Sequence, residues 1–226
     1  MQRHFEEQLE QLRERLLTMG SLVEKAVHLS VESLEQRNES LATQVIAEIE
    51  PQINNLQLEL DDRALQLLAL QQPMAVDLRL ITSTMKINSD LERMGDQAVN
   101  IAERALSILS QPFHKVSIDL PRMAEISEQM VKDSLDAFVR RDSELARQVV
   151  LRDDEVDQFR DKVFGELIAC MIKVPRCIQQ SLDMILVSRN LERIADHATN
   201  IAEDVIYVVE GQDIRHHAEA RANAKP

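Results

Sequence analysis

The sequence contains few of the residues from which β-sheets and their turns are built. Its 226 residues include no Trp, one Tyr, 5 Phe and 4 Gly. A sheet protein of this size would need many glycine-containing turns and a stock of aromatic and β-branched side chains. The most abundant residues are instead Leu, Ala, Glu, Gln, Arg and Met, which lose little on entering a helix. We therefore expect an all-α protein, and 44% hydrophobic residues suffice for a packed core.

Positively charged residues are also fewer than negatively charged ones. The chain has 26 Lys and Arg against 39 Asp and Glu, which gives a formal net charge of -13. Such a chain is repelled by phosphate backbones, so nucleic-acid binding as a main function is excluded. No run of 18 apolar residues could span a bilayer, and the N-terminus, MQRHFEEQLEQLRERL, does not resemble a secretory signal. We expect a cytoplasmic protein.

The two cysteines are too few for a disulfide scaffold. Cys170 and Cys177 lie seven residues apart on either side of Pro175, and they belong to no CxxC motif or Cys/His cluster. We expect them to be two small, buried thiols.

Apolar residues recur at helical spacing between a few Pro, Gly and turn-like clusters. The long break QPFHKVSIDLP separates two sets of three predicted helices. We therefore expect two tandem, similar three-helix bundles, residues 1–111 and 112–226, the second with a short tail from Gln212 to Pro226 that is loose at its end. Asn38 or Ser40 can cap the second helix, and Pro51 can kink it. The predicted helices cover residues 3–36, 40–70, 73–110, 121–140, 143–173 and 175–209.

The two halves also match in sequence. LERMGDQAVNIAE at 91–103 and LERIADHATNIAE at 191–203 are identical at 9 of 13 positions, at an offset of 100. LATQVI at 41–46 similarly pairs with LARQVV at 145–150. The chain therefore contains an internal repeat, and we expect each copy to carry the same function.

Each repeat has a ladder of oxygen-bearing side chains on its third helix. The spacing of four, four and three residues places the ladder within about an 80° arc of the helix, at the edge of the apolar seam. Like charges one turn apart repel by about 0.2–0.5 kcal/mol, so something must neutralise them. Arg93 and Arg193 point about 100° away from their neighbouring ladders. Oxygen ligands without thiolate favour hard cations such as Mg²⁺, Mn²⁺ or ferric iron. The ladders are Glu92, Asp96, Asn100 and Glu103, and Glu192, Asp196, Asn200 and Glu203.

A metal site also needs ligands from a second helix. Asp153 and Asp157 supply a pair with the same spacing in the second repeat. If Ile53 is aligned with Val156, the first repeat offers Glu50 and Asn54, close to Pro51 and one extra residue. The predicted metal ligands are Glu50, Glu92, Asp96, Asn100, Asp153, Asp157, Glu192, Asp196 and Asn200.

The blocks QQPMAVDLR (71–79), LERMGDQAVNIAE, LERIADHATNIAE and VEGQDIRH (209–216) resemble those of the PhoU family of phosphate-specific transport system accessory proteins. The similarity extends over nearly the whole chain. It implies two three-helix bundles with multinuclear clusters of iron, zinc or related ions at paired E(D)xxxD motifs. Asn54 stands where that motif has Asp. The matching motif residues are Glu92, Asp96, Asp153, Asp157, Glu192 and Asp196.

The same resemblance implies a regulatory function. PhoU proteins restrain phosphate uptake and the phosphate-starvation response, and they work with the ATPase of the phosphate ABC transporter and with a sensor histidine kinase. The protein would contact these membrane complexes only peripherally. The long first helix, with Met19 among its flexible apolar side chains, could help a homodimer to form.

Two other functions stay open from the residues. A carboxylate-bridged di-iron oxidoreductase requires Glu-x-x-His pairs facing a bundle core, but His28 follows Glu24 by four residues and His197 points away from the ladder. We expect both histidines at the surface. No nucleophile elbow or phosphate loop occurs either, so we expect no enzyme. In a purely structural helical adaptor, the ladders would only solvate an exposed face.

Overall fold

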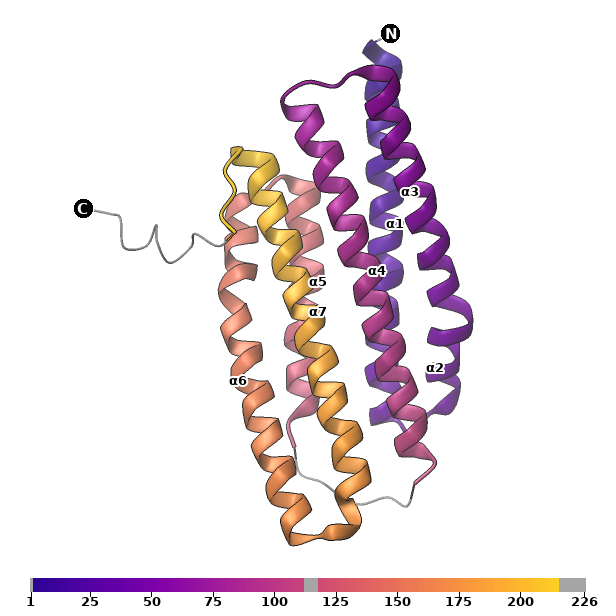
Figure 1. Cartoon of the computed structure of the whole chain (residues 1–226), viewed down its shortest axis with the longest axis vertical. Coiled ribbons are helices and arrows are strands. Elements are labelled where there is room, and N and C mark those ends of the chain that lie inside the picture. Colours follow the sequence, from indigo (N-terminus) through magenta and orange to yellow (C-terminus); the bar gives the residue numbers. More distant parts are fainter. Residues whose placement is uncertain (1, 112–117, 216–226) are drawn as a thin grey trace, which may run out of the picture.

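The computed structural model describes residues 2–111 and 118–215, with side chains from Phe5 onward. These residues form helices and turns only. Because α2, the π-helical turn and α3 follow one another without a break, the described residues form six long helices, and the prediction of an all-α fold with two tandem three-helix bundles is confirmed (Figure 1). The elements are α1 (Gln2–Glu35), α2 (Glu39–Gln44), a π-helical turn (Val45–Ile49), α3 (Glu50–Gln71), α4 (Val76–Leu109), α5 (Leu120–Arg140), α6 (Ser143–Lys173), a 3₁₀ turn (Pro175–Cys177) and α7 (Ile178–Glu210).

The first bundle consists of α1 to α4 and the second of α5 to α7. They lie side by side, with α4 packed against α7 and α1 against α5 (Figure 1). Most of the buried apolar side chains of both bundles form one continuous core cluster. The predicted boundary at 111/112 adjoins residues 112–117, which lie outside the described residues, as do residues 216–226 of the predicted loose tail; both remain predictions.

Polar contacts tie α4 to α7 at both ends of their antiparallel crossing. Lys86 Nζ lies 3.0 Å from Asp204 Oδ1. Farther along the pair, the buried carboxylate of Asp183 accepts hydrogen bonds from Ser107 and Gln111, each at 3.0 Å, and lies 3.5 Å from Arg104. These bonds satisfy a carboxylate that would be costly to bury alone.

Capping residues explain several helix ends. The Asn38 side chain accepts from the Ser40 amide and Asp142 accepts from the amides of Glu144 and Leu145, because the first amides of a helix have no partner within it. The predicted start of the third helix at Pro73 is wrong. Gln72 and Ala75 have φ of 47° and 48°, so the backbone cannot be helical before α4 begins at Val76.

The helix is irregular near Pro51, where a kink was predicted, and the irregularity is a π-helical turn just before this proline. From Leu41 to Ile53 the first repeat has one residue more than the second repeat has from Leu145 to Val156. A π-helical turn holds one extra residue in a helix, and proline clashes with the carbonyl four residues before it. Because Val45–Ile49 takes up this residue, the buried faces beyond it stay in register: Ile53 and Val156 are both buried.

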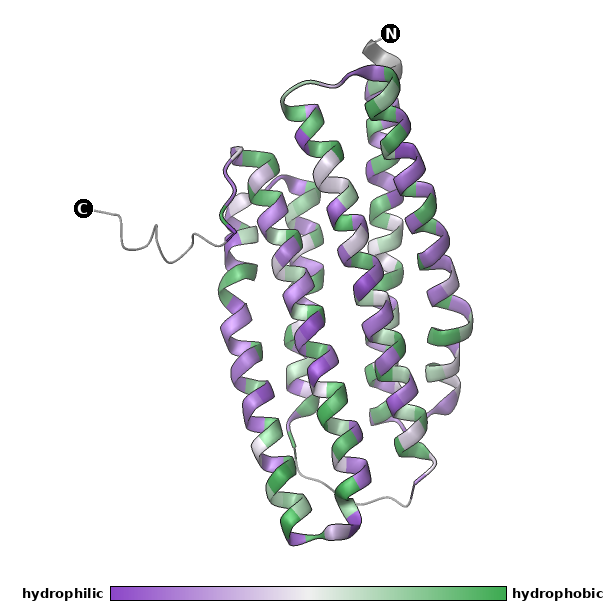
Figure 2. Ribbon diagram, in the orientation of Figure 1, coloured by the Kyte–Doolittle hydropathy of each residue, from purple (hydrophilic) through white to green (hydrophobic). Residues whose placement is uncertain are grey.

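None of the helices, over the residues that are described, contains a stretch long and apolar enough to cross a membrane. Figure 2 shows polar and apolar residues alternating along most helices, while the ends of α6 and α7 near the 3₁₀ turn are largely apolar. Several of these side chains are exposed, among them Phe164, Ile172 and Ile178.

Candidate metal centres

The predicted acidic pairs of the second repeat interact across neighbouring helices. Asp153 and Asp157 lie on α6, and Glu192 and Asp196 on α7, which packs against it. Burial, followed by Glu192, Asp153 and Asp157, raises the pKa of Asp196 to about 6. Burial and the charge of Asp157 raise the pKa of Asp153, although Thr199 Oγ1 donates to its carboxylate at 3.4 Å. The four carboxyl groups therefore repel one another in a partly dry setting.

Arg160 neutralises part of this charge. Its guanidinium lies 2.6 Å from Glu192 Oε1 and 2.9 Å from Asp157 Oδ1, and it also bonds Asp161. Arg160 thereby bridges α6 and α7. This arginine was not among those predicted near the ladders, Arg93 and Arg193, which are adjacent to the glutamates in sequence. The available signal was its spacing, because Arg160 follows Asp157 by three residues and so lies on the same side of the helix.

The first repeat brings together a smaller acidic group. Burial, Asp96 and Glu50 raise the pKa of Glu92, and burial and Glu50 raise that of Asp96. Glu50 on α3 therefore faces α4, as the alignment predicted, because the π-helical turn absorbs the extra residue. Asn54 Nδ2 donates to Glu50 Oε1 at 2.7 Å. The position aligned with Arg160 is Gln57, so this repeat has no arginine at the equivalent place.

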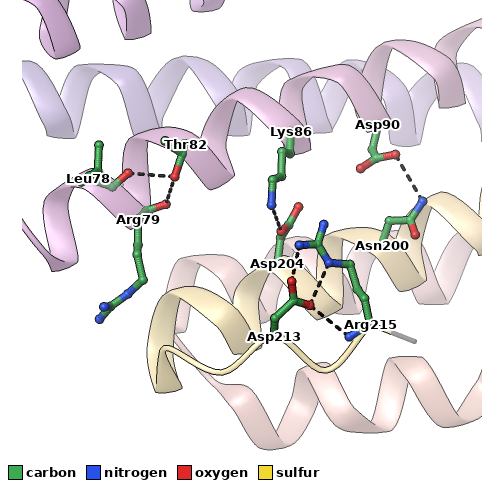
Figure 3. A network of polar contacts seen from close by, with 9 residues as sticks. All are labelled: Leu78, Arg79, Thr82, Lys86, Asp90, Asn200, Asp204, Asp213 and Arg215. Atoms are coloured by element: carbon green, nitrogen blue, oxygen red, sulfur yellow. Dashed lines mark hydrogen bonds and ion pairs between the residues drawn. The ribbon is translucent and has the colours of Figure 1, made fainter. Parts of the chain in front are cut away.

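The two predicted asparagine ligands differ in their surroundings. Asn200 Nδ2 lies 3.4 Å from Asp90 Oδ1 on α4, so its amide is directed toward the other bundle (Figure 3). Asn100 is exposed, one turn beyond Asp96. The assignment of either asparagine to a metal site remains a prediction.

The expectation that His197 is a surface residue is wrong. The residue is 7% exposed, and its Nδ1 lies 2.9 Å from Asp90 Oδ1. His197 lies outside the ladder, on the side of α7 against which α4 packs. His28 is exposed, as expected, and lies near Glu128 and Glu32.

The donor chemistry of both acidic groups suits a hard cation, since carboxylate oxygens predominate and raised carboxyl pKa values mark negative charge that is incompletely balanced. In their present positions, however, no three Asp, Glu, His or Cys side chains of the described residues are arranged to hold a metal ion. The guanidinium of Arg160 already forms ion pairs with Asp157 and Glu192, and the amide of Asn54 already donates a hydrogen bond to Glu50. The side chains fit a metal by type and location, and would have to exchange these partners to bind it.

Two further sequence blocks, one containing Arg79 and one containing Gly211, meet where α4 begins and α7 ends. Arg79, from the DLR block, has its guanidinium carbon 3.6 Å from the point that a Cβ on Gly211 would occupy. Gly211 ends α7 at φ 71°, a conformation that favours glycine. Asp213, whose pKa is lowered by hydrogen bonds from Arg215, forms an ion pair with that arginine at 2.5 Å (Figure 3). Segments more than 100 residues apart in sequence thus form one surface.

Together, the duplicated bundles and paired acidic helices define a tandem-repeat, all-α protein with a candidate acidic centre in each repeat. A model of the PhoU domain matches the chain twice, at residues 16–105 and 120–205. The chain belongs to the PhoU family.

Individual relatives agree with this assignment. The chain is 40% identical over 222 residues to a phosphate-specific transport system accessory protein PhoU homolog of Pseudomonas putida, covering 98% of this chain and 86% of the relative. The crystal structure of PhoU from Pseudomonas aeruginosa matches with a TM-score of 0.89 and 41% identity, over 92% of this chain and all of that one. The phosphate transport system regulatory protein PhoU from Streptococcus pneumoniae has a TM-score of 0.85 and 29% identity, over 92% and 98% of the two chains.

Proposed function

We propose that this protein is an accessory protein of a phosphate-specific transport system that restrains phosphate uptake and the phosphate-starvation response. The names of relatives that align with nearly the whole chain support the link to phosphate transport. The partners that we propose are the ATPase of the phosphate ABC transporter and a sensor histidine kinase. Contact with them would be peripheral to the membrane, from the cytoplasm.

We further propose that the acidic groups bind metal ions, with iron, manganese, magnesium and zinc as the candidates. The observation that carries this proposal is the carboxyl crowding between α6 and α7, where the pKa of Asp196 rises to about 6. Asp153, Asp157, Glu192 and Asp196 would hold the metal in the second repeat. Glu50, Glu92 and Asp96 would hold it in the first, where Asn54 offers an amide oxygen instead of a carboxylate. Asn100 and Asn200 would be the outer ligands.

A bound ion would supply fixed positive charge to these helix faces. The chain's own part is to hold the carboxylates close together on two packed helices and to keep them partly out of water. Because the protein carries a net charge of -13, neutralising these faces would change the field that a docking partner meets. Binding to the transporter ATPase or the kinase would then depend on metal occupancy.

The test is binding of the purified protein to the transporter ATPase before and after treatment with a chelator. We expect weaker binding after chelation and recovery when Mn²⁺ or Fe²⁺ is restored. The variant Glu192→Gln/Asp196→Asn has lost two negative charges and two ligands of the second repeat, so chelation should change its binding less than it changes that of the wild type. Glu155→Gln/Glu166→Gln removes the same charge from the opposite side of α6 and should behave as wild type. Unchanged affinity after chelation would refute the dependence on metal.

One observation favours a second function, that of a purely structural adaptor. Arg160 already pairs with Asp157 and Glu192, as expected if the acids serve only to join α6 to α7. In that case Glu192→Ala/Asp196→Ala would leave metal content unchanged while the protein still bound its partner. Loss of metal from this variant would favour the metal-binding function.

We also propose that the protein has no catalytic activity, that it forms a homodimer and that its repeats divide at 111/112. The regulatory and accessory names of its relatives support the first of these proposals. The exposed side of α1 would be available to a second copy. Met19 would not take part in that contact, because it is completely buried. Light scattering measures the mass directly, and a mass near 26 kDa rather than twice that value would refute the dimer.

A further inference from the structure

The two cysteines lie in contact with each other. Cys170 Sγ, in the last turn of α6, is 2.9 Å from Cys177 Sγ at the end of the 3₁₀ turn. Both are free thiols. Cys177 is buried as expected, but Cys170 is only half-buried, so the expectation of two buried thiols is wrong for this residue. The more exposed sulfur of the pair can be reached from solvent.

The hairpin turn between α6 and α7 creates this contact. In an uninterrupted helix, residues seven apart would be separated by about 10.5 Å along the axis, too far for a disulfide. Here the Val174 amide donates to the Cys170 carbonyl at 2.8 Å, and the Cys177 amide donates to the Val174 carbonyl at 2.9 Å. These bonds reverse the chain between the two cysteines. The pairing is therefore a property of the folded hairpin.

Polar contacts prepare one sulfur to lose its proton. The thiol of Cys170 and the hydroxyl of Ser181, 3.5 Å away, can both donate to Cys177 Sγ. These hydrogen bonds lower the pKa of Cys177, and the same contact between the sulfurs raises the pKa of Cys170. When the pair loses one proton, the two sulfurs share the other, so that a thiolate lies next to a thiol.

We propose that Cys170 and Cys177 form a modification site at which a hydroperoxide converts the two thiols into an intramolecular disulfide. The sulfurs need to approach by only about 0.9 Å to reach the S–S bond length of about 2.05 Å. The site lies in the second repeat only, because the positions at an offset of 100, Leu70 and Asp77, carry no thiol.

The first step oxidises Cys170. After the pair has released one proton to water, the remaining proton lies mainly on Cys170, the less acidic sulfur. Because Cys170 is the sulfur that solvent can reach, this proton crosses the 2.9 Å contact to Cys177 as Cys170 Sγ attacks one peroxide oxygen. An S–O bond forms and the O–O bond breaks. With hydrogen peroxide the leaving hydroxide takes up the released proton and becomes water. Cys170 is now a sulfenic acid, and the peroxide has been reduced.

The second step forms the disulfide. Cys177 Sγ attacks the sulfur of Cys170, the S–S bond forms and the S–O bond breaks. The departing hydroxide takes the proton of Cys177 and leaves as a second water molecule. Two thiols and one hydrogen peroxide thus give one disulfide and two waters, and a dithiol reductant reverses the change. The new bond would fix the end of α6 to the turn before α7, next to the exposed Ile172 and Ile178.

The full-length protein, reduced and freed of reductant, should be treated with hydrogen peroxide and then alkylated. The chain has 2 Cys, so no other thiol interferes. We expect both thiols to be lost together, and peptide mass spectrometry should find a peptide pair linked through Cys170 and Cys177 that is lighter by two hydrogens. Dithiothreitol should restore both thiols. Thiols that remain alkylatable, or disulfides formed only between molecules, would overturn the proposal.

Two controls separate this chemistry from ordinary thiol oxidation. In Cys177→Ser, Cys170 has no thiol partner, so its sulfenic acid should persist, react with dimedone and progress to sulfinic acid. The wild-type protein unfolded in urea should form the disulfide at least ten times more slowly than the folded protein, since the hairpin is lost. Equal rates with and without urea, or sulfinic acid forming as readily in wild type as in Cys177→Ser, would contradict a preorganised dithiol.

Discussion

Replacing Arg160 with glutamine is expected to strengthen metal binding by the second repeat. Arg160 holds Glu192 at 2.6 Å and Asp157 at 2.9 Å, so an incoming ion has to displace the guanidinium from two of its proposed ligands. Glutamine keeps much of the side-chain length but has no charge. The variant therefore removes a tethered cation that competes with the metal.

The magnitude follows from the exposure of the two ion pairs. The side chain of Arg160 is 32% exposed, that of Glu192 19% and that of Asp157 48%. Partly exposed pairs of this kind contribute about 0.2–1 kcal/mol each, so their combined loss amounts to about 0.5–2 kcal/mol. A metal ion that no longer has to break them should bind about 2- to 30-fold more tightly.

Isothermal titration of the metal-free protein with Mn²⁺ measures this change. Glu50→Gln/Glu92→Gln, introduced in the wild type and in each variant, confines the measurement to the second repeat. Arg193→Gln is the matched control, because it removes the same charge from the adjacent α7 position, which points about 100° away from the acidic group. We expect tighter binding for Arg160→Gln and little change for Arg193→Gln.

The reasoning would be refuted if Arg160→Gln bound Mn²⁺ no more tightly than wild type, or if Arg193→Gln gave the same increase. The first result would mean that the guanidinium does not compete for the ligands. The second would mean that only the overall charge matters. If neither wild type nor variant bound metal, the proposed metal function itself would fail.

Three further predictions concern stability. A Cβ on Gly95 would lie 3.2 Å from Ile53 Cδ1, an atom that valine lacks. Gly95→Ala should therefore stabilise the protein by about 0.5–1 kcal/mol more in an Ile53→Val background than in the wild type, as measured by urea unfolding. Equal effects in the two backgrounds would contradict the close contact. Asp183→Ala should cost about 2–3 kcal/mol in the same assay, because Ser107 and Gln111 lose their acceptor, and a loss below about 0.5 kcal/mol would refute that role. The pKa of Asp196 is raised to about 6, so its protonated form favours the folded state: with chelator present, this contribution is complete below about pH 4 and is lost as pH rises through 6. Melting temperatures of wild type should therefore fall relative to Asp196→Asn between pH 5 and 7; parallel curves would contradict it.

Local patterns in the sequence were enough to predict the helices and the repeat. Apolar spacing, caps such as Asn38 and the break after Ser110 depend on residues close together in the chain. The start of α4 was harder to predict, because an alanine gives no signal of the positive φ that Ala75 adopts. The extra residue before Pro51 was visible in the alignment, but its accommodation as a π-helical turn required knowledge of which face α3 buries.

The residues of the candidate sites differ in the same way in how well the sequence predicted them. Spacing along one helix identified Glu192 and Asp196, the same spacing on the preceding helix identified Asp153, and the repeat alignment pointed to Glu50. Contacts between helices were harder to predict: Arg160 reaches Glu192 across the α6–α7 pair, and His197 is buried only because α4 covers it. Such contacts depend on how the helices are placed together, which periodicity along one helix does not specify.

The most direct test of the metal-binding account is elemental analysis of the protein, purified without an affinity tag or added metal, together with Glu192→Gln/Asp196→Asn and Glu50→Gln/Glu92→Gln. The account predicts bound iron, manganese or zinc in the wild type, with a separate part of it lost in each double variant. Wild-type protein that contained no more metal than either variant, and took up none from excess Mn²⁺ or Fe²⁺, would contradict the account.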